Sequence, residues 1–370
     1  MKSISNKLCL FAAALIAPIA LSNAAQAAGA GDLYKNKTFT VLINYSAGGP
    51  TDIEGRLFAR HIGKHIPGKP TVISKNMAGS AGVVASNYLG LKAKADGMMM
   101  GYCTNLAAAF AFKPLKDKGL KVDPAKFKII ATVSGLIISY IRSDVAPGLK
   151  KAEDIMKTNG FTVGGSSVYS QLDIEKRLML DLLGLKYKYV TGYRGASKTR
   201  VALMQNEIQL SAESQPSYRS KVIPTLVKTG QVVPLFYHPL DDGKRVISSP
   251  ADVEGLGIMG FHEFYEKVKG KKPSGIEWKA LRSILRFAGS AIRTLVLPPG
   301  SPKASVDALR QAVTSLAKDP IYAADAKKSI GFVPRFRVGA DAEELIRVST
   351  RLEPDVVEFL KGYVAKARKK

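Results

Sequence analysis

The stretch FTVLINYSAGGPTD, residues 39–52, decides the fold because it joins an apolar strand to a glycine turn and a helix. Apolar residues recur at every second position from Phe39 to Ile43, which is the period of a strand. Two glycines break this pattern, and Pro50 suits a first helical position because its missing N–H needs no partner there. The turn therefore presents free backbone N–H groups at a helix N-terminus, where an anion is favoured. A turn of the same shape without a ligand is the alternative for this segment alone.

A second unit of the same kind follows. Residues 71–74 form a short strand that enters the small-residue loop 76–82, and an amphipathic helix begins there. A turn at Asp96 and Gly97 leads into a third strand, residues 98–103. Two strand–loop–helix units in succession predict a parallel sheet with both loops at the carboxyl edge of the strands, where open α/β sheets bind ligands.

The pattern is interrupted and then repeated later in the chain. Residues 129–133 and 136–141 read as buried strands at a crossing to a second lobe, and the strand 161–163 again enters a glycine and serine loop followed by a helix. We predict an α/β fold of two lobes, each a mixed sheet flanked by helices. The predicted boundaries are 32–131 plus 235–370 for lobe I and 132–234 for lobe II.

The N-terminus has the pattern of a secretory signal peptide. Lys2 and Lys7 precede an apolar run over residues 8–21 and the small-residue sequence that ends at Ala27. The apolar run is too short to span a membrane, which takes roughly 20 residues. We predict cleavage near Ala27 and a periplasmic location. Only Cys103 then remains, so no internal disulfide can form.

The charge and the remaining motifs narrow the function. The net charge of +25 is scattered along the chain and accompanies no nucleic-acid-binding motif, so it favours encounter with anionic ligands. A basic surface without a role is the alternative. No serine-hydrolase elbow or nucleotide loop is present, and His61 and His65 share a helix face without a third metal ligand. We expect no enzyme activity, no cofactor, no metal and no nucleic-acid partner.

Several motifs in fixed order carry a resemblance to a known family. The chain resembles the substrate-binding proteins of tripartite tricarboxylate transporters, also called Bug receptors, over nearly the whole mature sequence. The motifs that match are Ala47–Asp52 with Arg56, Asn76 with Gly79–Gly82, Asp96–Gly97, Gly164–Ser170, Tyr193–Gly195 and Leu297–Pro302.

This resemblance implies a periplasmic-binding-protein fold that closes on a small carboxylate. Two glycine loops of lobe I would grip the carboxylate through backbone N–H groups and waters, and lobe II would supply further contacts. The ligand-binding residues predicted in this way are Tyr45, Ser46, Gly48, Gly49, Thr51, Asp52, Ser80, Ala81, Gly82, Ser166, Ser167, Tyr169, Ser170, Asp173, Arg194, Glu213 and Ser214.

The sequence departs from the family pattern in the second glycine loop and in lobe II. Residues 77–78 lack the usual arginine and proline, Tyr169 replaces a glycine, and Asp173 stands where the family often has histidine. Glu213 and Ser214 stand where the family tends to have aspartate and asparagine. A relative's ligand is therefore not transferable. We hypothesise that Tyr169 narrows the pocket or stacks on a ring, and that Asp173 and Glu213 meet a cationic or hydroxylated end of the ligand.

These observations predict a monomeric periplasmic receptor that captures a small organic carboxylate and delivers it to a tripartite tricarboxylate-type transporter. One alternative is an exported enzyme that uses Asp52, Asp173 or Glu213 as a base. Another is a ligand-sensing partner of a sensor kinase. The sequence does not separate these roles.

Overall fold

The computed structural model describes residues 33–111, 119–123, 126–193, 195–241, 244–248, 253 and 255–368. The predicted signal peptide, residues 1–27, and the predicted site residue Arg194 lie outside the described part of the chain. Within the described part, no helix is both long enough and apolar enough to cross a membrane.

The deciding stretch folds as the sequence predicts. Strand β1 (Thr38–Ile43) runs into a turn, and helix α2 (Pro50–Ile62) begins with its proline in the first turn. Strands β2 (Thr71–Asn76) and β3 (Met99–Thr104) both pair with β1 in parallel. The loops after these three strands therefore lie at one edge of the sheet, and the prediction of a parallel unit is confirmed.

Strand β1 is buried on both faces, which explains its apolar composition. Val41 and Ile43 pack in one hydrophobic cluster with Leu57 of α2. Leu42 points to the other face and packs in a second cluster with Leu89 of α3 (Val83–Leu91). The alternation of side chains along a strand thus fixes the helix on each face of the sheet.

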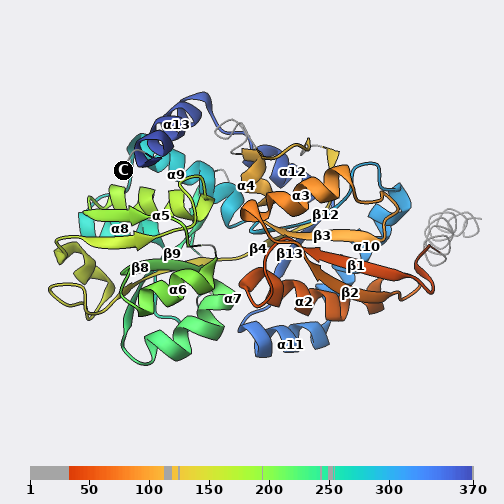
Figure 1. Cartoon of the computed structure of the whole chain (residues 1–370), viewed down its shortest axis with the longest axis horizontal. Helices are drawn as coiled ribbons and strands as arrows, with labels where there is room; N and C mark the ends of the chain where they lie inside the picture. Colours follow the sequence, from red (N-terminus) through yellow and green to blue (C-terminus); the bar gives the residue numbers. More distant parts are fainter. Residues whose placement is uncertain are drawn as a thin grey trace, which may run out of the picture.

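Lobe I is built on a mixed six-stranded sheet with the strand order β13-β4-β12-β3-β1-β2 (Figure 1). β12 is antiparallel to both β3 and β4, and β13 is antiparallel to β4. The further elements of this lobe are β4 (Lys128–Ser134), β12 (Arg293–Leu297), β13 (Arg335–Val338), α4 (Leu106–Ala111), α10 (Lys303–Leu316), α11 (Pro320–Ile330) and α12 (Ala340–Ser349), with 3-10 turns η1 (Gly63–His65) and η2 (Ser80–Gly82).

Lobe II is built on a mixed five-stranded sheet with the strand order β7-β6-β8-β5-β9. β6 is parallel to β7 and β8, whereas β5 is antiparallel to β8 and β9. Its elements are β5 (Ile137–Arg142), η5 (Ala152–Lys157), β6 (Phe161–Gly164), α5 (Gln171–Leu182), β7 (Tyr187–Val190), α6 (Ala196–Met204), β8 (Leu210–Ser214), α7 (Gln215–Ser217), the π-helical η6 (Tyr218–Val227), β9 (Val232–His238), β10 (Leu240–Asp241), β11 (Val246–Ile247), α8 (Phe261–Lys269) and α9 (Gly275–Ala288).

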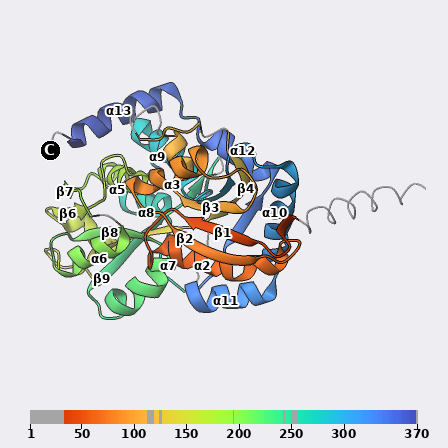
Figure 2. The same ribbon diagram turned by 45° about the vertical axis from the view of Figure 1, so that its right-hand side comes forward.

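The chain returns to lobe I later than the predicted residue 235. β9 continues to His238 within the second sheet, α8 packs on β9, and α9 packs on α5. The strand that re-enters the first sheet is β12, which begins at Arg293. The final helix α13 (Pro354–Arg368) then lies over lobe II against α9, as both views show (Figures 1 and 2). An apolar strand such as β9 suits either sheet, so its sequence alone does not place it.

The topology brings the loop-bearing edges of the two sheets to face each other. β4 and β3 are both antiparallel to β12, so β4 ends at the same edge as β1, β2 and β3. The chain crosses from this edge directly into β5, whose first residue pairs with the last residue of β8. The loops after β6 and β8 therefore lie opposite the loops after β1 and β2. This is the arrangement of a site between two lobes.

Candidate ligand-binding site

The first loop of lobe I is shaped by Asp52, the third residue of α2. Its carboxylate accepts hydrogen bonds from the Gly48 amide, from Arg56 Nε and from Asn76 Nδ2, each at 2.8 Å. Burial alone would raise the pKa of Asp52, but these three donors hold it below its usual value. The carboxylate therefore stays charged and holds the turn to α2 and β2.

The same turn keeps backbone donors available. In the part of the chain that the structure describes, the amides of Ala47 and Gly49 donate to no protein acceptor. Ser46 is exposed beside them, and Pro50 has no N–H. Unpaired amides at the start of a 13-residue helix form an anion-binding surface, because the helix dipole adds roughly half a positive charge there.

Asn44, a residue that the sequence analysis did not select, ties this turn to the end of β3. Its Nδ2 donates to the Thr104 carbonyl at 2.7 Å, and its Oδ1 accepts from the Thr104 amide at 2.8 Å. The hydroxyls of Thr51 and Thr104 are 2.7 Å apart. Asn44 could have been selected from the sequence because it is an asparagine at the carboxyl end of an apolar strand, where a buried side-chain amide needs hydrogen-bond partners.

The second loop of lobe I packs directly on Asn44. Gly82 adopts φ +94°, and a Cβ added there would lie 2.2 Å from Asn44 Nδ2 and 3.2 Å from the Thr104 carbonyl oxygen. Ser80 is exposed, also at a positive φ of 46°. The two loops that carry the predicted residues of lobe I, including the backbone of Ala81, are thus brought together around one buried amide.

A buried ion pair lies at the same edge of lobe I and was also missed from the sequence. Arg293 at the start of β12 donates to Glu54 of α2 at 2.8 Å, and Tyr102 donates to the same carboxylate at 3.2 Å. Tyr45 accepts a hydrogen bond from Asn105 Nδ2 at 2.7 Å. Burial raises the pKa of Tyr45 to about 12, although the nearby Arg293 charge opposes this rise. The phenol therefore stays protonated and can donate to a ligand.

In lobe II, Asp173 holds the loop before α5 in the way that Asp52 holds the loop before α2. Its carboxylate accepts from the amides of Ser166 and Ser167 at 2.7 and 3.1 Å, and Lys176 Nζ lies 2.9 Å away. Burial raises the pKa of Asp173, but Lys176 and the two amides outweigh it and hold the value below the ordinary one. Asp173 is thus engaged within the protein, and its contact with a cationic or hydroxylated end of a ligand stays a prediction.

Glu213 is likewise engaged. Its carboxylate pairs with Arg200 at 2.6 Å and accepts from Tyr140 at 2.9 Å and from Ser217. Burial raises the pKa of Glu213 and outweighs the opposing Arg200 charge. The neighbouring Ser214 ends β8 and directly precedes α7, and its buried hydroxyl has no partner among the described residues. Ser214 is therefore the more available of these two predicted residues.

The remaining predicted residues of lobe II line the same loop. Tyr169 and Ser170 are both half-buried, and the amides of both residues donate to Ser167, at 3.2 and 2.9 Å respectively. The loop is therefore ordered by bonds to its own serine.

A buried chain of three side chains in lobe II has the order of a serine, histidine and acid triad. Ser139 Oγ is 3.0 Å from His238 Nε2, and His238 Nδ1 is 2.6 Å from Glu175. A nucleophile must be reachable by its substrate, yet all three residues are buried. The chain therefore joins α5 to β5 and β9 as a structural contact.

His61 on α2 and His65 at the end of η1 are bound to different carboxylates. His61 Nε2 lies 2.8 Å from Asp325, and His65 Nε2 lies 3.0 Å from Asp319. Both contacts fasten α2 and η1 to the α11 region. Among the described residues, no group of three or more His, Cys, Asp and Glu side chains could hold a metal ion.

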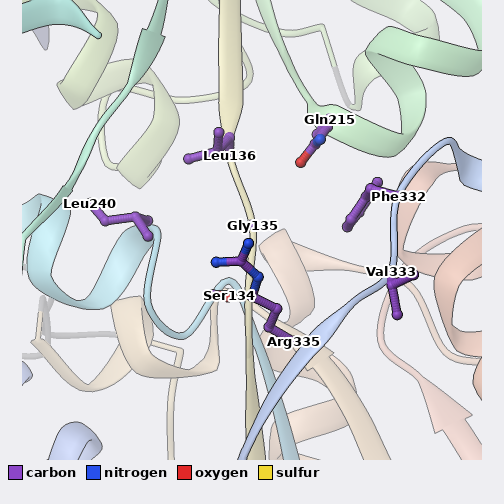
Figure 3. A pocket seen from close by; sticks show the side chains of 8 residues that line it. All are labelled: Ser134, Gly135, Leu136, Gln215, Leu240, Phe332, Val333 and Arg335. Atoms are coloured by element: carbon purple, nitrogen blue, oxygen red, sulfur yellow. The ribbon is translucent and has the colours of Figure 1, made fainter. Parts of the chain in front are cut away.

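A small pocket lies where the chain crosses between the lobes, outside the predicted site. Figure 3 shows Leu136 and Gln215 on one side of it, and Phe332 and Arg335 on the other. Its volume is about 10 Å³, close to what one water molecule needs. The crossing is therefore tightly packed, and the Gly135 amide donates to the carbonyl of Gly289, in the second connection between the lobes.

Comparisons with known proteins address the fold. No protein-family model matches the chain. A UPF0065 protein from the TAR-I ttuE-ttuC′ intergenic region of Agrobacterium vitis is 27% identical over 209 residues, 53% of this chain and 56% of that protein. A UPF0065 protein from the tcbD-tcbE intergenic region of Pseudomonas sp. strain P51 is 23% identical over 234 residues, 62% of this chain and 66% of that protein. The chain thus spans about half to two thirds of the length of these relatives.

Solved structures match over nearly their full length. The periplasmic binding protein BugD has a TM-score of 0.63 at 17% identity, with 90% of this chain and 99% of BugD covered. MatC from Rhodopseudomonas palustris with bound malate has a TM-score of 0.58 at 17% identity, covering 89% and 99%. Another R. palustris protein, solved with adipate, has a TM-score of 0.61 at 15% identity, covering 90% and 97%.

These neighbours are binding proteins rather than enzymes. Their agreement with the sheets and crossings of this chain confirms the predicted two-lobed α/β architecture. The structural neighbours are Bug- and TctC-type periplasmic binding proteins, and the chain has their fold, as the sequence motifs predicted.

Proposed function

We propose that the chain is a periplasmic receptor that captures a small organic carboxylate between its lobes and delivers it to a tripartite tricarboxylate-type membrane transporter. The observation that carries this proposal is the pair of amides at Ala47 and Gly49, which have no acceptor among the described residues and lie at the N-terminus of α2 beside the loop 80–82. Hydrogen bonds to a charged acceptor each contribute about 1.5 to 3 kcal/mol net, so a few suffice for useful affinity.

The predicted residues take two kinds of role in this proposal. The backbone of both lobe I loops and the hydroxyls of Tyr45, Ser46 and Thr51 contact the carboxylate. Asp52 positions the first loop through the Gly48 amide, and Asp173 and Glu213 position lobe II. The residues that would reach the far end of the ligand are Ser166, Ser167, Tyr169, Ser170, Arg194 and Ser214.

The proposal agrees with the ligands of the structural neighbours, of which one was solved with malate and another with adipate. It also agrees with the N-terminal pattern of a signal peptide, which would bring the mature chain to the periplasm. The unpartnered amides, the ion-paired state of Asp52, Asp173 and Glu213, and the buried Ser139 favour binding over catalysis.

The test measures the melting temperature of the mature protein against a panel of small carboxylates. A ligand at 100 times its dissociation constant adds roughly 2.7 kcal/mol, which raises the midpoint by several degrees. Gly82→Ala should abolish the shift, because its Cβ would displace Asn44 and separate the two loops. Gly270→Ala is the matched control, because Gly270 also has a positive φ but no neighbour within 4 Å.

A shift that survives in Gly82→Ala, or a response to sugars or cations in place of carboxylates, would contradict the proposed site. Delivery is tested separately. Deleting the gene should abolish uptake of the identified ligand, whereas unchanged uptake together with co-purification of a sensor-kinase ectodomain would point to sensing.

A further inference from the structure

The loop before α5 in lobe II is occupied by a carboxylate of the chain itself. Asp173 Oδ2 accepts from the Ser166 amide, the Ser167 amide and the Ser166 hydroxyl, at 2.7, 3.1 and 3.2 Å. Paired backbone amides at a helix N-terminus are the groups that bind an external carboxylate in other sites. Here Asp173 fills that position before any ligand arrives.

The charge of Asp173 is balanced inside the protein. Lys176 Nζ lies 2.9 Å from Asp173 Oδ1 and donates to the Gly164 carbonyl at 2.5 Å, and its side chain is 2% exposed. Gly165 leaves room for the carboxylate, because a Cβ there would lie 2.6 Å from it. The ammonium is thus buried behind Asp173 and is not available to a ligand.

Two other cations of lobe II, Arg177 and Arg200, are also engaged. Arg177 donates to the Val168 carbonyl at 3.1 Å, and its guanidinium lies 4.8 Å from the ring centroids of both Tyr189 and Tyr363. Arg200 is paired with Glu213. Asp173 and Glu213 of lobe II are therefore neutralised by cations of the same lobe, whereas the lobe I amides of Ala47 and Gly49 have no acceptor among the described residues.

We propose that the receptor takes ligands with a single carboxylate, bound by lobe I, and discriminates against dicarboxylates because Asp173 occupies the amide pair of lobe II that would receive a second carboxylate. This inference rests on the proposed function and names the chemical class of its ligand. A second ligand carboxylate would lose its hydration and meet the negative charge of Asp173 in place of free amides. Asp173 is a specificity-determining residue that acts by position and charge.

The experiment uses acids matched in carbon number, butanoate with succinate and hexanoate with adipate, in calorimetric titrations of the mature protein. Each monocarboxylate should bind about tenfold or more tightly than its partner. Equal or tighter binding of the dicarboxylates would overturn this inference while the receptor function stands. Failure of every carboxylate to bind would instead overturn the proposed function, and the inference with it.

Substitution of Asp173 provides an independent arm. Asp173→Ser frees the two amides and Lys176, so succinate should now stabilise the protein more than butanoate does. Asp181→Ser is the matched control. It removes a carboxylate from the same helix, and among the described residues this carboxylate bonds only to Tyr187 and Tyr363.

If Asp173→Ser does not fold, the double variant Asp173→Ser/Lys176→Met leaves no buried charge unpaired and still frees the amides. The penalty on dicarboxylates should then shrink relative to the wild-type protein. An unchanged preference in a folded variant would show that Asp173 does not determine the ligand class.

Discussion

The two lobes place the same residue at the same local position and use it differently. Asp52 and Asp173 are each the third residue of a helix that follows a strand, and each accepts hydrogen bonds from the loop before its helix. In lobe I the cation partner is Arg56, whose side chain is 46% exposed. In lobe II it is Lys176, whose side chain is 2% exposed.

The difference shows that burial of the cation changes what an aspartate at the third position of a helix does. Asp52 binds one loop amide and leaves those of Ala47 and Gly49 available, so its loop remains open to an anion. Asp173 binds two amides and is sealed by a buried cation, so its loop is already satisfied. The first arrangement suits recognition of a ligand, and the second suits a fixed wall against which the ligand is held.

The largest effect is expected when the buried pair is broken. Lys176→Met leaves Asp173 buried without its cation, which should lower the free energy of unfolding by about 3 to 5 kcal/mol. Urea unfolding of the mature protein measures this loss. Lys157→Met is the matched control, because Lys157 also lies three residues after its aspartate, Asp154, at 2.8 Å, but is 67% exposed. A similar loss of unfolding free energy in both variants would show that burial of the lysine does not determine the strength of the pair.

A smaller effect is expected from acid. The pKa of Asp173 is held below its ordinary value of ~3.9, so the unfolded chain binds the proton first as the pH falls. The stability that Asp173 contributes is therefore complete above about pH 5 and is lost as the pH falls through the native pKa, below ~4.

Unfolding experiments from pH 7 to pH 3 on the wild-type protein and Asp173→Asn check this expectation. The difference in unfolding free energy between the two proteins should stay constant down to about pH 5 and narrow below it. Asp52→Asn should behave with the same sign, since the pKa of Asp52 is also lowered. A difference that widens toward low pH would contradict the assigned direction.

The smallest effect is expected at Arg56, the partly exposed cation that pairs with the buried Asp52. Arg56→Ala removes one donor, but Asp52 keeps the Gly48 amide and Asn76, so the free energy of unfolding should fall by at most about 1 kcal/mol. The ligand-induced rise in melting temperature should persist. A loss as large as that of Lys176→Met would show that the two lobes depend equally on their cations.

Local patterns predicted much of lobe I because they depend on neighbours in the chain. The alternation from Phe39 to Ile43 and the position of Pro50 gave the strand, turn and helix in the order that the structure has. Helix α13, residues 354–368, packs against α9 of lobe II. Its sequence does not predict this neighbour, because an amphipathic face shows only that it is covered and not which element covers it.

In the candidate site, too, local features were predicted and contacts between residues distant in sequence were not. Glycines and small polar residues marked the loops, but Asn44 with Thr104 and Glu54 with Arg293 were not foreseen, since these partners are 60 and 239 residues apart. Glu213 was selected for a possible ligand contact, yet Arg200 and Tyr140 bind its carboxylate. The sequence does not show whether a carboxylate near a predicted loop is free to contact a ligand or is paired with a cation that is distant in the chain.

The sequence by itself determined the strand–turn–helix units, the two-lobed class and the edge at which the loops gather, because side-chain periodicity and turn geometry act over a few residues. Only the tertiary structure decided that β9 and α13 belong beside lobe II, and that Asp173 is sealed by Lys176 while Asp52 leaves amides free. Those outcomes depend on burial and on partners distant in sequence. The hydrogen bonds and charges that a buried group requires are satisfied only once the whole chain has folded.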